Sequence, residues 1–409
     1  YPLGQNVCWA SNYDYFLKKI QDYGGNYVRV WLCPWNLQLE DPREPGKYDL
    51  RVANALDELF ALCRRRGLYV QLVLRYHGMH NGDWSKSPYN TANGGPCTSP
   101  GQFFTDPDAR DQHKAFLDYV VARWAHTPAL FAWELWNEAD LARADRDSDL
   151  VAWHKEMANY LNQIDPYDHL VTTSVASPGR NTELFELANI DFVPVHFYKR
   201  DVVRHIYDNY LRFRDLGKPV FIGEFSGGHK PADDLADTRG VRIHAGLWSA
   251  FVTPLAGSAM PWWWDTWVDK NELYGHWAAL AKFAKGVDRR SKHYEVIRSR
   301  IRVGEDLWAS MQGLVCPSEA FLWVYDAGQV LRPEHPSGPL LLDGRTVKLR
   351  GLLGGTFRVE IWHTATGEPL DQTTARTDDG VLAFPLPKSD RDLAVKITRQ
   401  GTVEPTLEW

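Results

Sequence analysis

The chain has 409 residues, of which 44% are apolar and 24% charged, and its formal net charge is -6. This length suits one large domain and a smaller one, and no apolar run approaches the roughly 18 residues that a membrane helix needs. Because the charge is mildly negative and the basic residues are scattered, the sequence argues against nucleic acid or an anionic membrane as a partner, and we expect a monomer with a neutral ligand.

Short β-rich runs alternate with runs of helical periodicity from the N-terminus to about residue 288, as in parallel strands joined by crossover helices. The predicted strands are Gly4–Trp9, Asn26–Leu32, Leu68–Leu74, Ala129–Trp136, Leu170–Ser174, Asp191–His196, Pro219–Gly223 and Leu255–Trp262. The predicted helices are Tyr13–Tyr23, Val52–Cys63, Ala115–Trp124, Leu150–Ile164, Val202–Phe213, Leu235–Phe251 and Leu273–Phe283, with a short one near Thr182–Leu187.

Eight strand–helix repeats favour an α/β fold of the (β/α)8 TIM-barrel type over an open doubly wound sheet, because no GxGxxG turn follows the first strand. After Ser291 the apolar residues alternate in short runs separated by Pro and Gly, which predicts a small antiparallel β-sandwich. We therefore predict a catalytic barrel over residues 1–290 and an accessory sandwich domain over residues 291–409.

Polar side chains follow the predicted barrel strands at their carboxyl ends, where barrel enzymes carry their chemistry. They are Arg29 in YVRVW, His77 in LRYHG, Asn137 and Glu138 in WELWNEAD, His196 and Tyr198 in PVHFY, Glu224 in FIGEFSG, and Trp264 in PWWWD. All of them are expected at one face of the barrel.

Glu138 and Glu224 follow the fourth and seventh strands, and such a pair suits glycosidic bond cleavage. One carboxyl protonates the leaving oxygen while the other attacks the anomeric carbon, which gives retention when the two lie about 5–5.5 Å apart. Burial or the charge of Glu224 would keep Glu138 protonated, while Arg29 would keep Glu224 ionised. A pair of structural acids bonded to Arg at the rim is the alternative.

The other strand-end residues have roles in the same reaction. Asn137 could donate to the sugar 2-hydroxyl, Tyr198 could orient the nucleophile, and His77 and His196 would form polar walls. Trp264 is the expected platform under the sugar and Trp262 shares its side of the strand. Further tryptophans are candidates for flanking subsites: Trp9, Trp35, Trp84 and Trp267.

Several acidic and histidine residues near these strands have plainer interpretations. Glu134 lies deeper in the fourth strand and is interpreted as an interior hydrogen-bonded acid. Asp140 and Asp265 could bind sugar hydroxyls or be solvated loop acids, and we leave both out of the catalytic set. The histidines fit no metal-ligand spacing, so we predict neither a metal nor a cofactor.

The ordered set of eight strand-end residues resembles glycoside hydrolase family five, in clan A, over residues 4–288. The resemblance implies a (β/α)8 barrel that hydrolyses β-linked glycans with retention, with Glu138 as acid/base and Glu224 as nucleophile. Ala139 departs from the proline usual after the NE pair, and the RVW context of Arg29 is similar to the family's β-mannanases.

The leading hypothesis is hydrolysis of a β-1,4-linked mannan or glucan by double displacement. An exo-acting β-mannosidase or β-glucosidase working on oligosaccharides is the alternative, and a non-catalytic carbohydrate-binding barrel is an alternative of another class. The long polar loop from His77 to Asp106 lies at the active face and would decide between the endo and exo modes.

The remaining composition leaves the compartment open. Aromatic residues make up 13% of the chain, which suits a sugar-stacking groove but also an aromatic-rich core. Five widely spaced cysteines give no disulfide framework, although Cys8 and Cys33 could pair if their strands are adjacent. The chain begins at Tyr1 without a signal peptide, so we expect a processed protein that is secreted or periplasmic.

Overall fold

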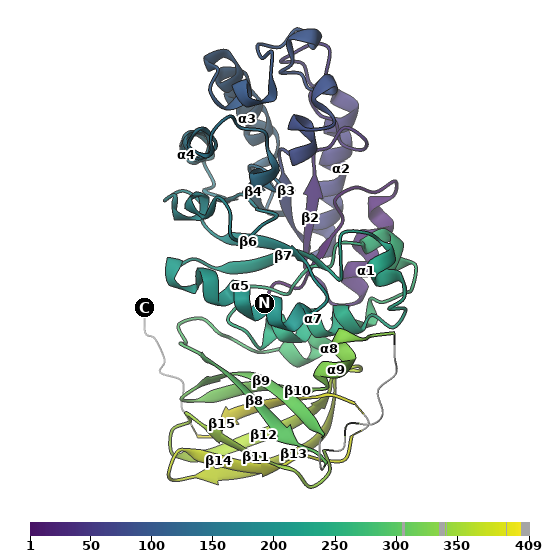
Figure 1. The fold of residues 1–409 in the computed structure, drawn as a ribbon, viewed down its shortest axis with the longest axis vertical. Helices are drawn as coiled ribbons and strands as arrows, with labels where there is room; N and C mark the ends of the chain where they lie inside the picture. The colour runs from purple at the N-terminus through teal and green to yellow at the C-terminus, as the bar shows by residue number, and fades with distance from the viewer. Residues whose placement is uncertain (305–306, 335–339, 341, 390, 402–409) are drawn as a thin grey trace.

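The structure is a computed structural model that describes residues 1–304, 307–334, 340, 342–389 and 391–401. An N-terminal (β/α)8 barrel stands on a C-terminal antiparallel β-sandwich (Figure 1), which confirms the predicted fold class. The predicted boundary near residue 290 falls between the last barrel helix and the first sandwich strand, and residues 402–409 of the predicted second domain lie outside the described residues. No helix among the described residues is long and apolar enough to span a membrane.

The barrel wall is built from parallel strands in chain order. These are β1 (Gly4–Asn6), β2 (Tyr27–Trp31), β3 (Tyr69–Val73), β4 (Leu130–Glu134), β5 (Leu170–Thr172), β6 (Val193–Tyr198) and β7 (Val220–Ser226). β1 to β5 form one continuous sheet, and β6 pairs with β7. The two sheets join where Asp191 donates its backbone N–H to the Val171 carbonyl at 2.8 Å and Val175 bridges Val195.

The predicted eighth strand, Leu255–Trp262, is not a regular strand, and only an isolated bridge joins Pro261 to Phe225. Its backbone bonds to Val220 through Ala256 and to Ile222 through Met260, so the segment is longer than the strand beside it. The extra residues between Ala256 and Met260 bulge toward the N-terminal segment of the chain. There the Ser258 N–H donates to the Pro2 carbonyl at 2.9 Å, and the Ser258 hydroxyl oxygen accepts from the Gly4 N–H at 2.8 Å. The segment therefore still closes the barrel.

The helices surround this wall and mostly follow the prediction. They are α1 (Tyr13–Asp22), α2 (Leu50–Arg66), α3 (Pro107–Trp124), α4 (Asp147–Ile164), α5 (Val202–Phe213), α6 (Ala232–Leu235), α7 (Val241–Phe251) and α8 (Gly275–Ala284). In α2, Asp49 caps the first turn by accepting the Arg51 N–H at 2.8 Å, and Leu56, Leu59 and Phe60 are buried on one stripe against the sheet.

The prediction of a single helix over Leu235–Phe251 is wrong, because the helical structure is interrupted between α6 and α7. Asp237 accepts the backbone N–H groups of Val241 and Arg242, both at 2.9 Å, and so caps a new helix. Gly240 stands directly before it with a φ of 65°, a conformation that favours glycine. The polar run from Asp237 to Gly240 carries the signals of this break, a capping aspartate and a glycine, which the helical periodicity on either side outweighed.

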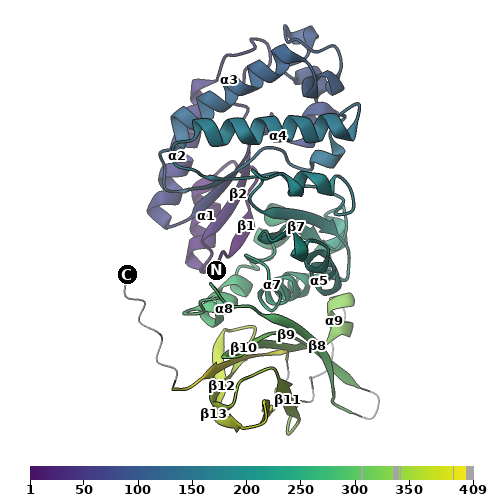
Figure 2. The same cartoon turned by 90° about the vertical axis from the view of Figure 1, so that its left-hand side faces the viewer.

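The sandwich consists of β8 (Glu295–Arg302), β9 (Trp308–Cys316), β10 (Glu319–Tyr325), β11 (Thr346–Arg350), β12 (Gly355–His363), β13 (Glu368–Thr377), β14 (Val381–Pro385) and β15 (Leu393–Arg399). Six strands form one sheet in the order β13-β12-β15-β10-β9-β8, and β11 pairs with β14 opposite it. A short helix, α9 (Ala327–Leu331), follows β10. Figure 2 shows the sheet edge-on beneath α7 and α8.

One face of the large sheet shares its apolar core with the barrel. Phe321 of β10 is 2% exposed and lies 5.8 Å from Phe251 of α7 and 6.5 Å from Phe283 of α8 between ring centroids. Polar contacts accompany it, since the Gln312 amide donates to Thr253 Oγ1 at 2.7 Å. The sandwich therefore braces the base of the last barrel helices.

We predict that Phe321→Ala destabilises the barrel as well as the sandwich, because it removes a buried ring from their shared core. The expected loss is about 3–5 kcal/mol in the free energy of unfolding, measured by urea denaturation with tryptophan fluorescence. Leu370→Ala, on an exposed side chain of β13, is the control and should leave unfolding unchanged. A barrel transition that keeps its midpoint in Phe321→Ala would contradict the shared core.

Candidate active site

The barrel gathers the predicted polar residues at the carboxyl ends of its strands. Arg29 lies in β2, Asn137 and Glu138 follow β4, His196 and Tyr198 lie at the end of β6, and Glu224 lies inside β7. One carboxyl oxygen of Glu138, one of Glu224 and a ring nitrogen of His196 all lie within 4.8 Å of one another. The two carboxyl groups therefore approach as closely as direct attack on an anomeric carbon requires.

A fully buried arginine organises this cluster. Arg29 donates from Nε and Nη2 to the two oxygens of Glu134, both at 2.7 Å, and from Nη1 to Glu224 Oε1 at 2.6 Å. Its Nη2 also donates to Asn137 Oδ1 at 2.7 Å. Glu134 is thus the interior acid that the sequence predicts, and its pKa is lowered because Arg29 outweighs the effect of burial.

A bulge in β7 aims Glu224 at the cluster. The pairing of β6 with β7 shifts between Val195 and His196, so that Val195 faces Ile222 and His196 faces Glu224. Gly223 is the extra residue, and a Cβ there would lie 2.9 Å from His196 Nε2. Glycine therefore lets the histidine approach the strand, and the bulge turns the next side chain inward.

Glu138 is almost completely buried among polar side chains. It is 7% exposed, and its oxygens lie 3.2 Å from His77 Nδ1 and 3.2 Å from His196 Nδ1. Burial raises the pKa of Glu138 to about 7, against a smaller opposing effect of His77. A carboxyl with this pKa can both give and take a proton near neutral pH.

Glu224 is held by donors on both oxygens. Arg29 donates to Oε1, the Tyr198 hydroxyl donates to Oε2, and His196 Nδ1 lies 3.4 Å from Oε2. Burial nevertheless raises the pKa of Glu224, although His196, Arg29 and the Tyr198 hydrogen bond all lower it. The expectation that the two glutamates have opposite environments is therefore wrong in its simple form, since burial acts on both and only their partners differ.

His77 and His196 line the site as uncharged side chains near neutral pH. Burial lowers the pKa of His196 to about 4 and also lowers the pKa of His77, although nearby carboxylates oppose both shifts. His77 Nδ1 additionally lies 3.2 Å from the Asn137 amide nitrogen. Asn137 is therefore held from both ends, by Arg29 on its oxygen and by His77 near its nitrogen.

The tryptophans form an aromatic wall beside the carboxyl pair, but the expected platform is wrong. Trp264 is only 2% exposed, because its ring packs 4.6 Å from Trp9 where a π-helix, η8 (Trp264–Asp269), begins. Trp262 is half-buried and lies 5.6 Å from Trp9 and 5.3 Å from Trp31. Trp262 is thus better placed than Trp264 to offer a face to a sugar.

Of the four tryptophans expected at flanking subsites, some are accessible beside the carboxyl pair and others are buried or lie elsewhere. Trp35 is 50% exposed and meets half-buried Trp9 edge-on at 5.3 Å, so both extend the wall. Trp267 is fully buried, with its indole N–H on the Asp237 carbonyl, and is excluded as a subsite. Trp84 is half-buried and packs on His80 at 5.5 Å, away from this wall.

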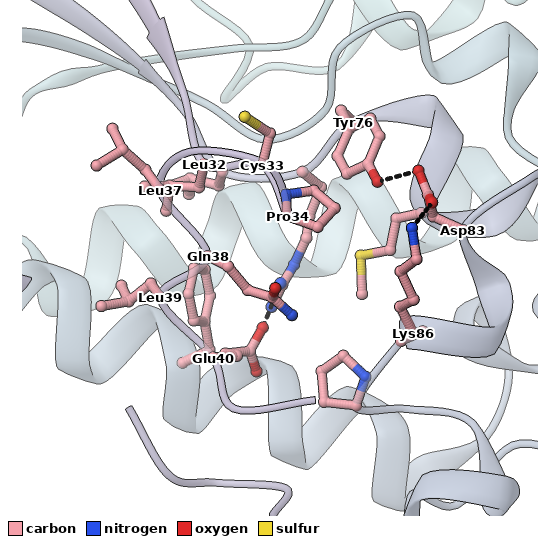
Figure 3. Close-up of a pocket in the computed structure, with 16 residues that line it drawn as sticks. Leu32, Cys33, Pro34, Leu37, Gln38, Leu39, Glu40, Tyr76, Asp83 and Lys86 are labelled. Carbon is pink, nitrogen blue, oxygen red and sulfur yellow. Dashed lines mark hydrogen bonds and ion pairs between the residues drawn. The ribbon is translucent and has the colours of Figure 1, made fainter. Parts of the chain in front are cut away.

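The long loop after β3 is ordered by short 3-10 turns and by polar anchors. Figure 3 shows a small pocket lined by this loop and by the segment after β2. Its floor carries the buried Arg75–Glu40 ion pair, and the Tyr76 hydroxyl donates to Asp83 at 2.8 Å. These contacts fix the chain beside His77.

The sequence did not predict two sets of contacts close to Glu138. Ser174 ends the predicted fifth strand, and its Oγ accepts the Glu138 N–H at 3.0 Å. Asp140 is buried and accepts two backbone N–H groups, whereas a solvated acid was equally expected. The strand-end rule applied to the fifth strand would have found Ser174.

The carboxyl cluster also has the ligand types of a metal site. Among the described residues, Glu138, His196 and Glu224 are the only group of such ligands close enough to hold an ion. Arg29 and Tyr198 already donate to both Glu224 oxygens, and a guanidinium at 2.6 Å repels a cation. The residues present fit carboxyl chemistry better than metal binding, and the absence of a metal stays a prediction.

All five cysteines are free and buried, so no Cys8–Cys33 disulfide is formed.

A (β/α)8 barrel with two buried glutamates meeting at the carboxyl ends of β4 and β7 defines the class of barrels to which retaining glycosidases belong. The family model for cellulases, glycosyl hydrolase family 5, matches residues 2–269. The chain belongs to this family.

Curated relatives in this family are named as mannanases. The chain is 28% identical to mannan endo-1,4-beta-mannosidase 8 of Oryza sativa subsp. japonica over 250 residues, which cover 49% of this chain and 66% of that protein. It is 30% identical to mannan endo-1,4-beta-mannosidase 3 of the same plant over 247 residues, covering 49% of this chain and 52% of that protein. The chain thus spans roughly half to two thirds of the length of these relatives.

Solved structures share the whole architecture. A glycoside hydrolase family 5 structure from Bacteroides vulgatus ATCC 8482 aligns with a TM-score of 0.62 and 15% identity, covering 100% of this chain and 92% of that one. At this identity the match supports the fold alone.

We predict that the protonation of Glu138 changes stability between pH 4.5 and 8. The pKa of Glu138 is raised from 4.5 to about 7 on folding, so the stabilisation is fully present below about pH 4.5 and is lost as the pH rises through 7. Relative to Glu138→Gln, which stays neutral, wild type should lose roughly 3 kcal/mol over this range in urea unfolding. Parallel stability curves for the two proteins would show that Glu138 titrates normally.

Proposed function

We propose that this chain hydrolyses β-1,4-linked mannan with retention, using Glu138 as general acid/base and Glu224 as nucleophile. The observation that carries the proposal is the approach of the two carboxyl groups, whose nearest ligand atoms lie within 4.8 Å. An inverting enzyme needs roughly 6.5–9.5 Å to fit a water between its carboxyl groups. This spacing supports direct displacement.

In the first step a Glu224 oxygen forms a bond to the anomeric carbon while the glycosidic C–O bond breaks. The leaving oxygen takes the proton of Glu138, whose pKa of about 7 leaves it largely protonated in mildly acidic solution. In the second step Glu138 takes a proton from water, the water oxygen bonds to the anomeric carbon, and the bond to Glu224 breaks. Two inversions give net retention.

The partners of each glutamate support this division of roles. Glu224 accepts from Arg29 and from Tyr198, and both contacts stabilise a carboxylate that must attack as an anion. Glu138 contacts only neutral histidines at 3.2 Å, so a proton on it is not opposed by a close cation. The amide of Asn137, whose oxygen accepts from Arg29, has N–H groups that can donate to a sugar 2-hydroxyl.

The substrate class rests on chemistry and on the relatives' names. The curated relatives are named as mannan endo-1,4-beta-mannosidases, and the aromatic wall of Trp9, Trp35 and Trp262 offers apolar faces for flat sugar rings. Among the described residues, Arg29 is the only cationic side chain bonded to the carboxyl pair, and it is fully buried and occupied by carboxylates, which favours an uncharged glycan. We further infer a domain boundary near residue 290 and a monomeric enzyme whose sandwich braces the barrel.

Glu224→Gln is predicted to lower kcat on mannan by about 10⁴-fold or more while the fold is kept, because the amide cannot attack the anomeric carbon. Release of reducing ends from mannan, glucan and xylan measures both the rate and the preferred sugar. Glu183→Gln, on an exposed glutamate, is the matched control and should retain wild-type rates. Unchanged turnover in Glu224→Gln would remove the mechanism.

A further inference from the structure

Asp140 is a buried carboxylate two residues after Glu138 that the proposed mechanism does not use. It is 6% exposed and lies in the 3-10 turn η5 (Ala139–Leu141). Its Oδ1 accepts the Ala176 N–H at 2.7 Å and its Oδ2 accepts the Ser177 N–H at 2.9 Å. Each oxygen therefore has a donor from the loop that follows β5, and the carboxylate joins two neighbouring active-site loops.

The backbone beside Glu138 is joined to the same loop. The Glu138 N–H donates to Ser174 Oγ at 3.0 Å, and the Ala139 N–H donates to the Ser174 carbonyl at 2.9 Å. Residues 138–140 are therefore joined to the residues after β5 by four hydrogen bonds, two from the backbone of residues 138 and 139 and two onto Asp140.

These contacts hold Glu138 in an unusual backbone conformation. Its φ is 54°, in the left-handed region that side-chain-bearing residues rarely adopt. Such a conformation costs free energy and persists only where surrounding contacts impose it. Bonds to Ser174 on one side and from Ala176 and Ser177 to Asp140 on the other are the contacts that do so here.

We propose that Asp140 is a positioning residue for the acid/base, which fixes the loop that carries Glu138 and sets a second carboxylate near the Glu138 carboxyl group. The inference rests on the proposed function and extends it to a residue that does not touch the substrate. The two hydrogen bonds that Asp140 accepts come from neutral backbone amides and not from a cation.

The charge of Asp140 acts on Glu138 together with groups from the surrounding strands. Those that face Glu138 are Arg29 on β2, His77 after β3, Glu134 on β4, His196 and Tyr198 on β6, and Glu224 on β7. Burial, Asp140 and Glu134 raise the pKa of Glu138, whereas His77 and Arg29 lower it. Removing the charge of Asp140 should therefore let Glu138 lose its proton at lower pH.

The test compares Asp140→Asn with wild type on mannan. The amide keeps the size of the side chain but has one acceptor oxygen, so it loses the charge and one of the two loop bonds. We expect kcat to fall about 10-fold or more with KM within a factor of about 2, and the alkaline limb of the kcat/KM profile to move to lower pH. Asp215→Asn, on an exposed acid between α5 and β7, is the matched control and should leave both unchanged.

Ser174→Ala separates the two contributions of Asp140. It removes the acceptor of the Glu138 N–H but keeps the Asp140 charge, so kcat should fall while the alkaline limb stays in place. Hydrogen exchange supplies a readout that needs no activity, since the amides of Ala176 and Ser177 should exchange at least about 10-fold faster in Asp140→Asn than in wild type.

The outcomes distinguish this inference from the proposed function. A wild-type enzyme that hydrolyses mannan, with a pH profile and amide exchange that Asp140→Asn leaves unchanged, overturns the positioning role alone. A wild-type protein inactive on every glycan overturns the proposed function and this inference with it. Faster amide exchange with a shifted alkaline limb supports both.

Discussion

The site depends on one buried cation, the guanidinium of Arg29. It is fully buried and bonds to Glu134 at the end of β4, to Asn137 just after it, and to Glu224 in β7. Burying an unpaired charge costs several kcal/mol, and here the two carboxylates offset that cost for the arginine as the arginine does for them. The charged groups at the catalytic end of the barrel interior are therefore stabilised as a set, because the guanidinium and the two carboxylates neutralise one another.

This arrangement also decides how the two glutamates differ. Both are buried, and burial raises the pKa of both. Glu224 shares the guanidinium and a tyrosine hydroxyl, while Glu138 is surrounded by neutral histidines and by the charge of Asp140. The difference between nucleophile and acid thus comes from hydrogen-bond partners rather than from the depth of burial.

The sequence predicted the barrel, the sandwich and the position of the polar cluster, because strand periodicity places carboxyl-end residues at one face. Depth in the fourth strand also separated Glu134 from Glu138 correctly, since strand alternation places both on the same side. The sequence pattern failed for Trp264, where a π-helix begins and strand alternation no longer applies, and for the eighth strand, which bulges toward the N-terminus. The role of Asp140 was not predictable, since its partners are backbone amides of another loop.

Trapping of the covalent intermediate tests the central claim most directly. A 2-deoxy-2-fluoro-β-mannosyl fluoride has a good leaving group, and its C2 fluorine destabilises the oxocarbenium-like transition states, so the glycosyl-enzyme should accumulate. We expect peptide mass spectrometry to find one fluorosugar on the peptide that contains Glu224, with activity recovering as the ester hydrolyses. A label on another side chain, or substrate turnover that releases the inverted anomer without any adduct, would contradict the account.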